Sequence, residues 1–176
     1  ILEKDIDLQL DILLNNIEVS YIHCKFTVKN STQVTQITAW FAEKSPLQLE
    51  INLVENEVNA YDVFSIGANA SQELAFALAK GKAILTNDAI TSVSFTFGIG
   101  TNFLIEIAKF RAFHQLWHRI TNAMQKSVLT TITAKTGFTN KSLQDPYTNI
   151  LRQTTEALSA VTGGVDILIV QPYDLL

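Results

Sequence analysis

Two histidines stand four residues apart in the run His114-Gln115-Leu116-Trp117-His118, a spacing that places both imidazoles on one side of a helix. Such a pair can chelate zinc. A helical metalloprotease site also needs a glutamate directly after the first histidine, and this position holds Gln115. No third ligand stands nearby in the sequence, so the pattern favours a surface-facing helix edge over a metal site.

A thiol nucleophile is the second candidate, because Cys24 follows His23. Adjacent residues on a strand point to opposite faces, so these two side chains cannot pair with each other. Among the acidic residues, Asp145 is best explained as a helix cap, and Asp166 and Asp174 lack partners close in sequence. We therefore find no catalytic constellation that could work by itself.

The run Gly98-Ile99-Gly100 precedes a predicted helix and could cradle a phosphate. It lacks the third glycine of a dinucleotide-binding fingerprint and the Gly-Lys-Ser/Thr ending of a P-loop. The pattern therefore favours a tight strand-to-helix turn. In a barrel, such a turn lies at the face that carries the active site.

Composition narrows the class of protein further. The 176 residues carry a net charge of −4, with 47% hydrophobic and 17% charged residues and no cluster of lysine or arginine. These values predict a globular domain or a piece of one, and they argue against nucleic-acid binding and against a membrane span. Cys24 is the single cysteine, so an internal disulfide is excluded and a cytoplasmic location is expected. The charged start predicts that no signal peptide is present. The missing initiating methionine indicates a fragment, a trimmed chain, or a chain whose first residues are not included.

Strands and helices alternate along the chain. The apolar and β-branched patterns predict helices at 5–14, 34–44, 71–83, 103–124 and 146–162, and strands at 17–28, 47–54, 58–66, 93–97, 128–134 and 165–170. Such alternation predicts a parallel sheet with helical crossovers. The apolar last strand predicts cover on both of its faces. Six strands are two fewer than a closed barrel needs, so an open doubly wound sheet remains an alternative.

Two helices show apolar stripes. The helix at 103–124 carries Phe103, Ile107, Phe110, Trp117, Ile120 and Met124 at helical spacing, and the helix at 146–162 carries Ile150, Leu151, Leu158 and Val161 on one face. Asn102 and Asp145 stand where helix caps are expected, and Pro146 fits the first helical position. Glu73 lies in the first turn of the helix at 71–83, where the helix dipole favours it.

Three runs of the chain resemble methylmalonyl-CoA mutases. They are FGIGTNFLIEIAKFRA at 97–112, continuing to Leu116-Trp117; QDPYTNILR at 144–152, followed by Thr154 to Ala157 and by Gly163-Gly164; and QELAFALA at 72–79. The resemblance spans residues 58–176, while the earlier part matches in pattern alone. It implies an α/β fold that is the later part of a (β/α)8 TIM-type barrel with parallel strands, covering residues 1–176 without the cobalamin-binding domain.

Within this family, two segments resemble the small subunit of the two-chain bacterial enzyme most. These are Asp145-Pro146-Tyr147 and the ending Gln171-Pro172-Tyr173-Asp174. This similarity implies a component of an isomerase that interconverts methylmalonyl-CoA and succinyl-CoA. It also implies a large catalytic subunit as heterodimer partner, and adenosylcobalamin in the holoenzyme but not on this chain.

Positions that contact substrate in active family members differ here. A Tyr-His pair in the family falls on Tyr61 and Asp62 in one register, and its histidine falls on Phe64 in a register shifted by two residues. The family's arginine two residues before a strand serine falls on Ser92, with Ser94 as that serine, and a family glutamine falls on Ala134. The resemblance thus implies substrate-contact positions that have lost the groups which orient a ligand.

Three hypotheses follow. The first is a non-catalytic small subunit that supports a large subunit, the second is a divergent but active mutase barrel, and the third is an unrelated α/β interaction module. An incomplete barrel would leave strand edges and apolar helix faces open, so the first two hypotheses predict self-association of the isolated chain.

Overall fold

The computed structural model describes residues 6–21, 23–28, 31–42, 44, 46, 48–53 and 56–174. The chain divides into two compact units, Ile1–Asn56 and Glu57–Leu176. Each unit has a hydrophobic core of its own and is described by itself.

The N-terminal unit is built around one parallel strand pair. Its elements are α1 (Ile6–Leu13), a 3₁₀ turn η1 (Val19–Tyr21), β1 (His23–Val28), α2 (Ser31–Ala42) and β2 (Gln48–Leu53). The two strands pair in parallel from His23 opposite Gln48 to Val28 opposite Leu53, so α2 is the crossover between them. The core of this unit contains Leu10, Ile37 and Phe41.

The C-terminal unit contains the remaining elements. They are β3 (Glu57–Asn59), α3 (Tyr61–Ser65), α4 (Ala70–Ile84), β4 (Ser92–Ile99), α5 (Phe103–Ala123), β5 (Leu129–Thr136), α6 (Pro146–Gly163) and β6 (Ile167–Ile169). Each of the six predicted strand regions contains an observed strand, and the predicted helices are observed with ends shifted by a few residues.

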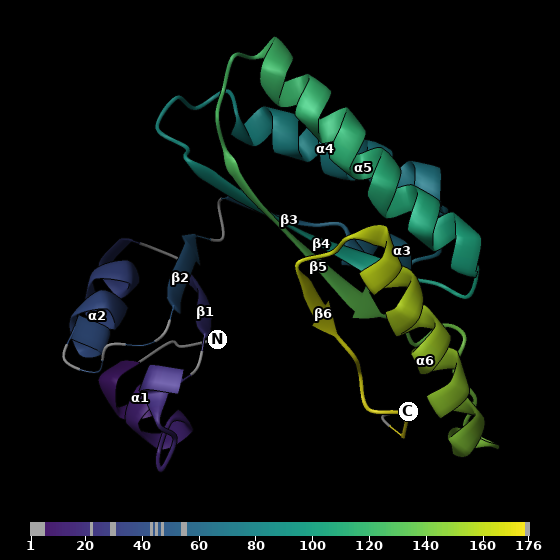
Figure 1. Ribbon diagram of the computed structural model, residues 1–176, viewed down its shortest axis with the longest axis horizontal. Helices are drawn as coiled ribbons and strands as arrows, with labels where there is room; N and C mark the ends of the chain where they lie inside the picture. The colour runs from purple at the N-terminus through teal and green to yellow at the C-terminus, as the bar shows by residue number, and fades with distance from the viewer. Residues whose placement is uncertain are drawn as a thin grey trace. The chain divides into compact units, whose positions relative to one another are not determined.

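The strands of this unit form one parallel sheet in which spatial order follows chain order, β3-β4-β5-β6. Crossovers between parallel strands are right-handed, so when each strand is added on the same side of the previous one, all connecting helices lie on one face of the sheet. Figure 1 shows α4, α5 and α6 along one side of the sheet, and their residues share a single core with it. This arrangement confirms part of a (β/α) barrel, since a doubly wound sheet carries helices on both faces.

An aromatic cluster joins the sheet to α5. Phe95 and Phe97 on β4 are fully buried, as are Phe110 and Phe113 on α5, and Trp117 is 5% exposed. The Phe95 and Phe113 ring centroids lie 4.7 Å apart in an edge-to-face arrangement, and the Trp117 indole donates a hydrogen bond to Thr130 Oγ1 on β5. The predicted stripe of the long helix is therefore confirmed as its sheet-facing side.

The predicted helix caps are confirmed. Asn102 accepts a hydrogen bond from the amide of Ile105, and Asp145 accepts one from the amide of Thr148. Asn69 and Gln72 form a reciprocal capping box at the start of α4. Gly164 ends α6 in the left-handed conformation, with φ of 89°, which glycine adopts without steric cost.

Two strand predictions were wrong over part of their length. In the predicted strand 17–28, residues 19–21 form a 3₁₀ turn, because Val19 turns into the core of its unit while Tyr21 stays exposed. In the predicted strand 58–66, pairing ends at Asn59 and the chain forms α3 instead. The Phe64 amide bonds to the Ala60 carbonyl, and the Phe64 ring packs beyond the end of the sheet. Packing thus overrides the β-propensity of this apolar run.

The expectation that the last strand is covered on both faces was also wrong within this chain. β6 is an edge strand of the described sheet, and Ile169 and Val170 are 42% and 48% exposed. The apolar stripe of α6 is likewise uncovered, with Leu151 69%, Leu158 55% and Val161 60% exposed. The buried side of α6 is largely polar, with Asn149, Gln153, Glu156 and Ser159 turned inward. The apolar stripe therefore identifies a surface of this chain and not its core.

In the described part of the chain, the helices lack the combination of length and apolar composition needed to cross a membrane.

Candidate functional site

The face of the sheet opposite the helices is polar. Side chains alternate along each strand, so the residues between the buried aromatic positions of β4 share this face with their paired neighbours. It carries Glu57 and Asn59 on β3, Ser92, Ser94 and Thr96 on β4, Thr131, Thr133 and Lys135 on β5, and Ile167 and Ile169 on β6. We call it the polar face. In a barrel this face lines the interior.

The structure separates the predicted contact positions on the strands. Ser92 and Ser94 lie on the polar face, and Ser94 is 5% exposed. Ala134 pairs with Phe97 and belongs to the helix-covered core, so it lies on the other side of the sheet. On β5 the polar face is represented by the neighbours of Ala134, Thr133 and Lys135.

The short helix α3 brings Tyr61, Asp62 and Phe64 to the carboxyl end of the sheet. The Phe64 ring lies directly against Gly98 of β4: a Cβ atom at Gly98 would come within 2.1 Å of Phe64 Cδ1. A Cβ atom at Gly137, just after β5, would come within 2.6 Å of Phe64 Cε1. A side chain at either position would collide with the ring, so both glycines are required for its placement.

Tyr61 is the second aromatic residue at this end. Its ring centroid is 6.0 Å from that of Phe64, and Lys135 Nζ lies 4.5 Å from the Tyr61 centroid. Partial burial raises the pKa of the Tyr61 hydroxyl, and the Asp62 carboxylate raises it further. Tyr61 is therefore a neutral phenol at physiological pH and is not prepared to act as a base.

A buried charge cluster lies behind the carboxyl end of β4. Lys109 Nζ donates to Glu73 Oε2 at 2.8 Å and to the Gly98 carbonyl at 2.7 Å, and it lies 2.6 Å from Glu106 Oε2. Glu73 Oε1 accepts the Gly98 amide at 2.7 Å. The Lys109 and Glu73 side chains are each 1% exposed. We call Glu73, Glu106 and Lys109 the charge cluster.

The charge cluster fixes the backbone on which Phe64 rests. It holds both the amide and the carbonyl of Gly98, the residue that the Phe64 ring covers. Burial raises the pKa of the Glu73 carboxyl, while Lys109 and the Gly98 amide partly oppose this effect. Lys109 donates to Glu73 and to the Gly98 carbonyl and forms an ion pair with Glu106, whose buried Oε2 accepts no hydrogen bond from the described residues. The charge of this lysine is therefore balanced within the cluster.

A second polar network holds the loop after β5. Lys141 Nζ lies 2.7 Å from Glu156 Oε1 on α6, and both side chains are 1% exposed. Asn149 bonds through its amide group to the carbonyls of Ser142 and Tyr173 at 2.9 and 3.0 Å. The polar side of α6 therefore anchors two segments at the carboxyl end of the sheet.

The histidine pair lies away from this end. His114 Nε2 is 2.9 Å from the Gly164 carbonyl, and His118 Nε2 is 2.9 Å from the Asn122 side-chain amide. Both histidines line a hollow of about 430 Å³ near the start of β5, which also contains Asp166. Asp166 accepts the Ile132 amide at 2.7 Å. Among the described residues we find no group of three or more potential metal ligands.

The other chemical candidates are structural. Cys24 is buried in the core of the N-terminal unit, and burial raises the pKa of its thiol, which disfavours the nucleophilic thiolate. The side chain of His23 lies outside the described residues. Gly98 and Ile99 belong to β4 and pair with Lys135 and Thr136, so the turn expected at Gly98 begins at Gly100 instead.

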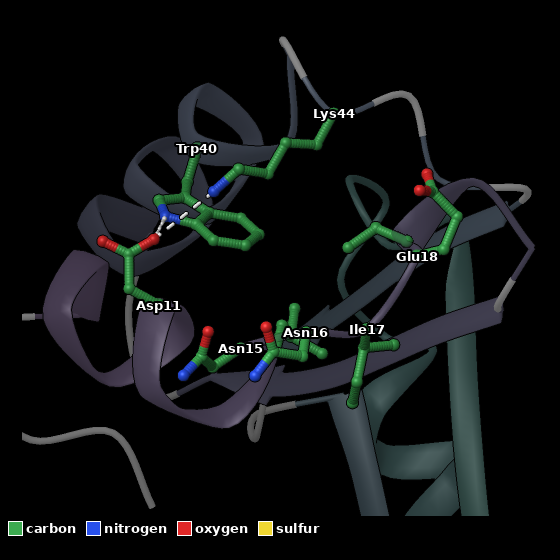
Figure 2. Close-up of a pocket in the computed structure, with 9 residues that line it drawn as sticks. Asp11, Asn15, Asn16, Ile17, Glu18, Trp40 and Lys44 are labelled. Carbon is green, nitrogen blue, oxygen red and sulfur yellow. Dashed lines mark hydrogen bonds and ion pairs between the residues drawn. The ribbon is translucent and has the colours of Figure 1, made fainter.

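The N-terminal unit contains a hollow of its own, about 590 Å³ in volume (Figure 2). Its charged groups contact each other: Lys44 Nζ lies 3.2 Å from the Trp40 ring centroid and 3.3 Å from Asp11 Oδ1. The Trp40 indole also donates to Asp11 Oδ1 at 3.1 Å. Figure 2 shows this contact at one side of the hollow, with Glu18 turned away from it. The arrangement provides no activated nucleophile among the lining residues.

The interpretation of the sequence missed the charge cluster. Glu73 was assigned to the helix dipole, and it does lie in the first turn of α4, but its carboxylate is turned into the core. One signal in the sequence indicates this cluster. Glu106 and Lys109 directly precede Ile107 and Phe110 of the apolar stripe of α5, and their i, i+3 spacing places the two charges on one face of the helix.

Comparison with known proteins identifies the family. The family model described as methylmalonyl-CoA mutase matches residues 7–175. The chain is 37% identical over 132 residues to the methylmalonyl-CoA mutase small subunit of Porphyromonas gingivalis, a match that covers 67% of this chain and 21% of that protein. It is 39% identical over 131 residues to the mitochondrial methylmalonyl-CoA mutase of Bos taurus, covering 66% and 18% of the two chains.

The human mitochondrial enzyme is 37% identical over 131 residues, with the same coverage as the bovine one. The chain spans about a fifth of the length of these curated relatives. The match to the family model, however, extends over nearly the whole of this chain and includes both of its units. This chain therefore belongs to the methylmalonyl-CoA mutase family.

Proposed function

We propose that this chain forms part of the barrel wall of a small mutase subunit and performs no chemistry itself. In this proposal residues 1–176 are one part of an acyl-CoA mutase-type barrel, and a large catalytic subunit is its partner in a cytoplasmic heterodimer. The complete enzyme interconverts methylmalonyl-CoA and succinyl-CoA. The support from relatives is the family match and the similarity to a protein named as a small subunit.

The observation that carries the non-catalytic part of the proposal is the position of Phe64. Its ring covers Gly98 and Gly137 at the carboxyl end of the sheet, where barrel enzymes place their reactive groups. The family resemblance expects a histidine at the position of Asp62 or, in the shifted register, of Phe64, and it expects an arginine at the position of Ser92. An acyl carbonyl at this end would therefore lack the positioned donors on which catalysis by orientation depends.

Adenosylcobalamin belongs to the proposed holoenzyme and not to this chain. The two described histidines His114 and His118 already contact Gly164 and Asn122, and they lie near the start of β5 and not at its carboxyl end. These residues do not fit a cobalt ligand at the polar face, so we derive no step through the cofactor from this chain.

Co-expression with the large subunit of a two-chain mutase tests the proposal. We expect the full-length protein that contains this chain to co-elute with the large subunit in size-exclusion chromatography. We also expect no turnover of methylmalonyl-CoA by the full-length protein alone when adenosylcobalamin is supplied. Separate elution would overturn the pairing, and turnover without a second subunit would overturn the non-catalytic role.

A divergent but active barrel is the second candidate, favoured by the polar face with Ser94, Thr96 and Thr133. It predicts that the full-length protein both binds acyl-CoA and turns it over, and the assay above separates it from the first candidate. The third hypothesis, an unrelated interaction module, is excluded by the family match.

A further inference from the structure

We propose that Phe64 is an internal plug: its ring fills an apolar seat formed by Gly98 and Gly137, and this seat fits the hydrocarbon end of a short acyl thioester. We call these two residues the glycine seat. The ligand class rests on the proposed function, whereas the existence of the seat rests on geometry alone.

The first argument is the shape of the seat. Two glycines from the ends of neighbouring strands face one ring, and Cβ atoms on Gly98 and Gly137 would lie 2.1 and 2.6 Å from its carbon atoms. The ring therefore occupies space that ordinary side chains at these positions would fill. Space kept free of side chains at the carboxyl end of barrel strands is where a ligand binds in this architecture.

The second argument is the rigidity of the floor beneath the ring. Gly98 is held by the Glu73 carboxylate at its amide and by the Lys109 ammonium at its carbonyl. Gly137 is held by a bond from its amide to the Ile99 carbonyl. Because these backbone groups are anchored independently of Phe64, the seat should persist when the ring is removed, as a cavity does in a packed interior.

The third argument concerns chemistry. Lys109 Nζ lies 5.7 Å from the Phe64 centroid, but it donates to Glu73 and to the Gly98 carbonyl and forms an ion pair with Glu106. The seat thus presents the backbone of two glycines to its occupant, with the Glu106 carboxylate near its edge at Gly100 and the neighbouring cation already paired. It should accept an alkyl group in preference to a group with a second carboxylate, since a buried carboxylate needs a donor.

The ring belongs to the short helix α3, which ends at the left-handed Gly67, and Phe64 is only partly buried. Its outer edge therefore reaches solvent, and a ligand could enter the seat from that side once the ring is absent. Tyr61 supplies a matched control, because it lies on the same helix but stacks toward Lys135 and not on the glycines.

The test is a calorimetric titration of the wild-type full-length protein, Phe64→Ala and Tyr61→Ala with CoA, acetyl-CoA, propionyl-CoA and butyryl-CoA. In Phe64→Ala we expect Kd to fall about fourfold for each added methylene that enters the seat. In wild type and Tyr61→Ala we expect no dependence of Kd on acyl length. A Phe64→Ala protein without chain-length dependence, or a wild type with the same dependence, overturns the proposal.

If none of the three proteins binds CoA, the acyl thioester is overturned as the ligand class, while the seat itself is still tested. In that case 1-butanol and toluene are used as probes, with binding followed by NMR. Binding to Phe64→Ala but not to wild type supports the seat, and binding to neither overturns it. If Phe64→Ala does not fold, Phe64→Val is titrated in its place, and the same order with a smaller gain is expected.

Discussion

Replacement of Lys109 by methionine should be one of the most destabilising single substitutions in the C-terminal unit. The ammonium group is 1% exposed and contacts two carboxylates and one carbonyl within 2.8 Å. Methionine keeps most of the side-chain volume but leaves Glu73 and Glu106 facing each other without a cation. Removing one partner of a buried ion pair costs about 3–5 kcal/mol, a large share of the roughly 5–15 kcal/mol that keeps a domain folded.

The assay is urea unfolding of the full-length protein followed by circular dichroism. Lys82→Met is the matched control, because Lys82 lies exposed in the last turn of α4, and its loss should change the free energy of unfolding by less than about 0.5 kcal/mol. The loss in Lys109→Met should be largest at neutral pH and smaller in acid, where protonation of Glu73, whose pKa is raised by burial, removes one of the two stranded charges.

A double variant separates charge from packing. Adding Glu73→Gln to Lys109→Met removes one of the two carboxylates that have lost their cation. The Gln side chain still offers an oxygen to the Gly98 amide, so part of the lost stability should return. A Lys109→Met protein within 1 kcal/mol of wild type, on the scale of ordinary substitutions, would refute the view that these charges are desolvated and mutually dependent.

Four further outcomes are expected. Gly98→Ala should lower the free energy of unfolding by about 1–3 kcal/mol, because the added methyl group collides with Phe64. Phe64→Ala in the same chain should relieve most of this loss. Additive losses in a double-mutant cycle would contradict the contact. Burial raises the pKa of Glu73, so protonation of this carboxyl stabilises the folded state. This stabilisation is fully present below the ordinary glutamate pKa of about 4.3 and is lost as the pH rises through the higher pKa of the folded state. The urea midpoint of Glu73→Gln should therefore vary less over this pH range than that of wild type. Asp145→Ala should lower the midpoint of thermal unfolding through loss of the α6 cap, while Asp145→Asn, which keeps a capping oxygen, should leave it nearly unchanged. The isolated chain should self-associate in analytical ultracentrifugation through the exposed stripe of α6, and Leu158→Lys should weaken this association more than Thr155→Lys on the same helix; a monomeric wild type would argue against an uncovered barrel edge.

The helix ends and the strand positions could be predicted because they depend on local chemistry. Asn102 and Asp145 cap their helices wherever those helices pack, since the bonds they accept come from amides three residues away. The apolar stripe of α5 is equally informative, because a long helix beside a sheet buries the side on which its apolar residues recur. The same rule failed for α6, where the polar side is buried and the apolar side is exposed.

What the amino-acid sequence determined by itself was the alternation of strands and helices and the resemblance to the mutase family, which predicts a replaced histidine at Asp62 or Phe64 and a replaced arginine at Ser92. Only the tertiary structure could decide which residues meet. Glu73, Gly98 and Lys109 come from three elements separated by up to 36 residues, and the packing of α3 across the end of the sheet sets Phe64 on Gly137. The physical reason is that burial and pairing of charges depend on neighbours distant in sequence, which local patterns do not encode.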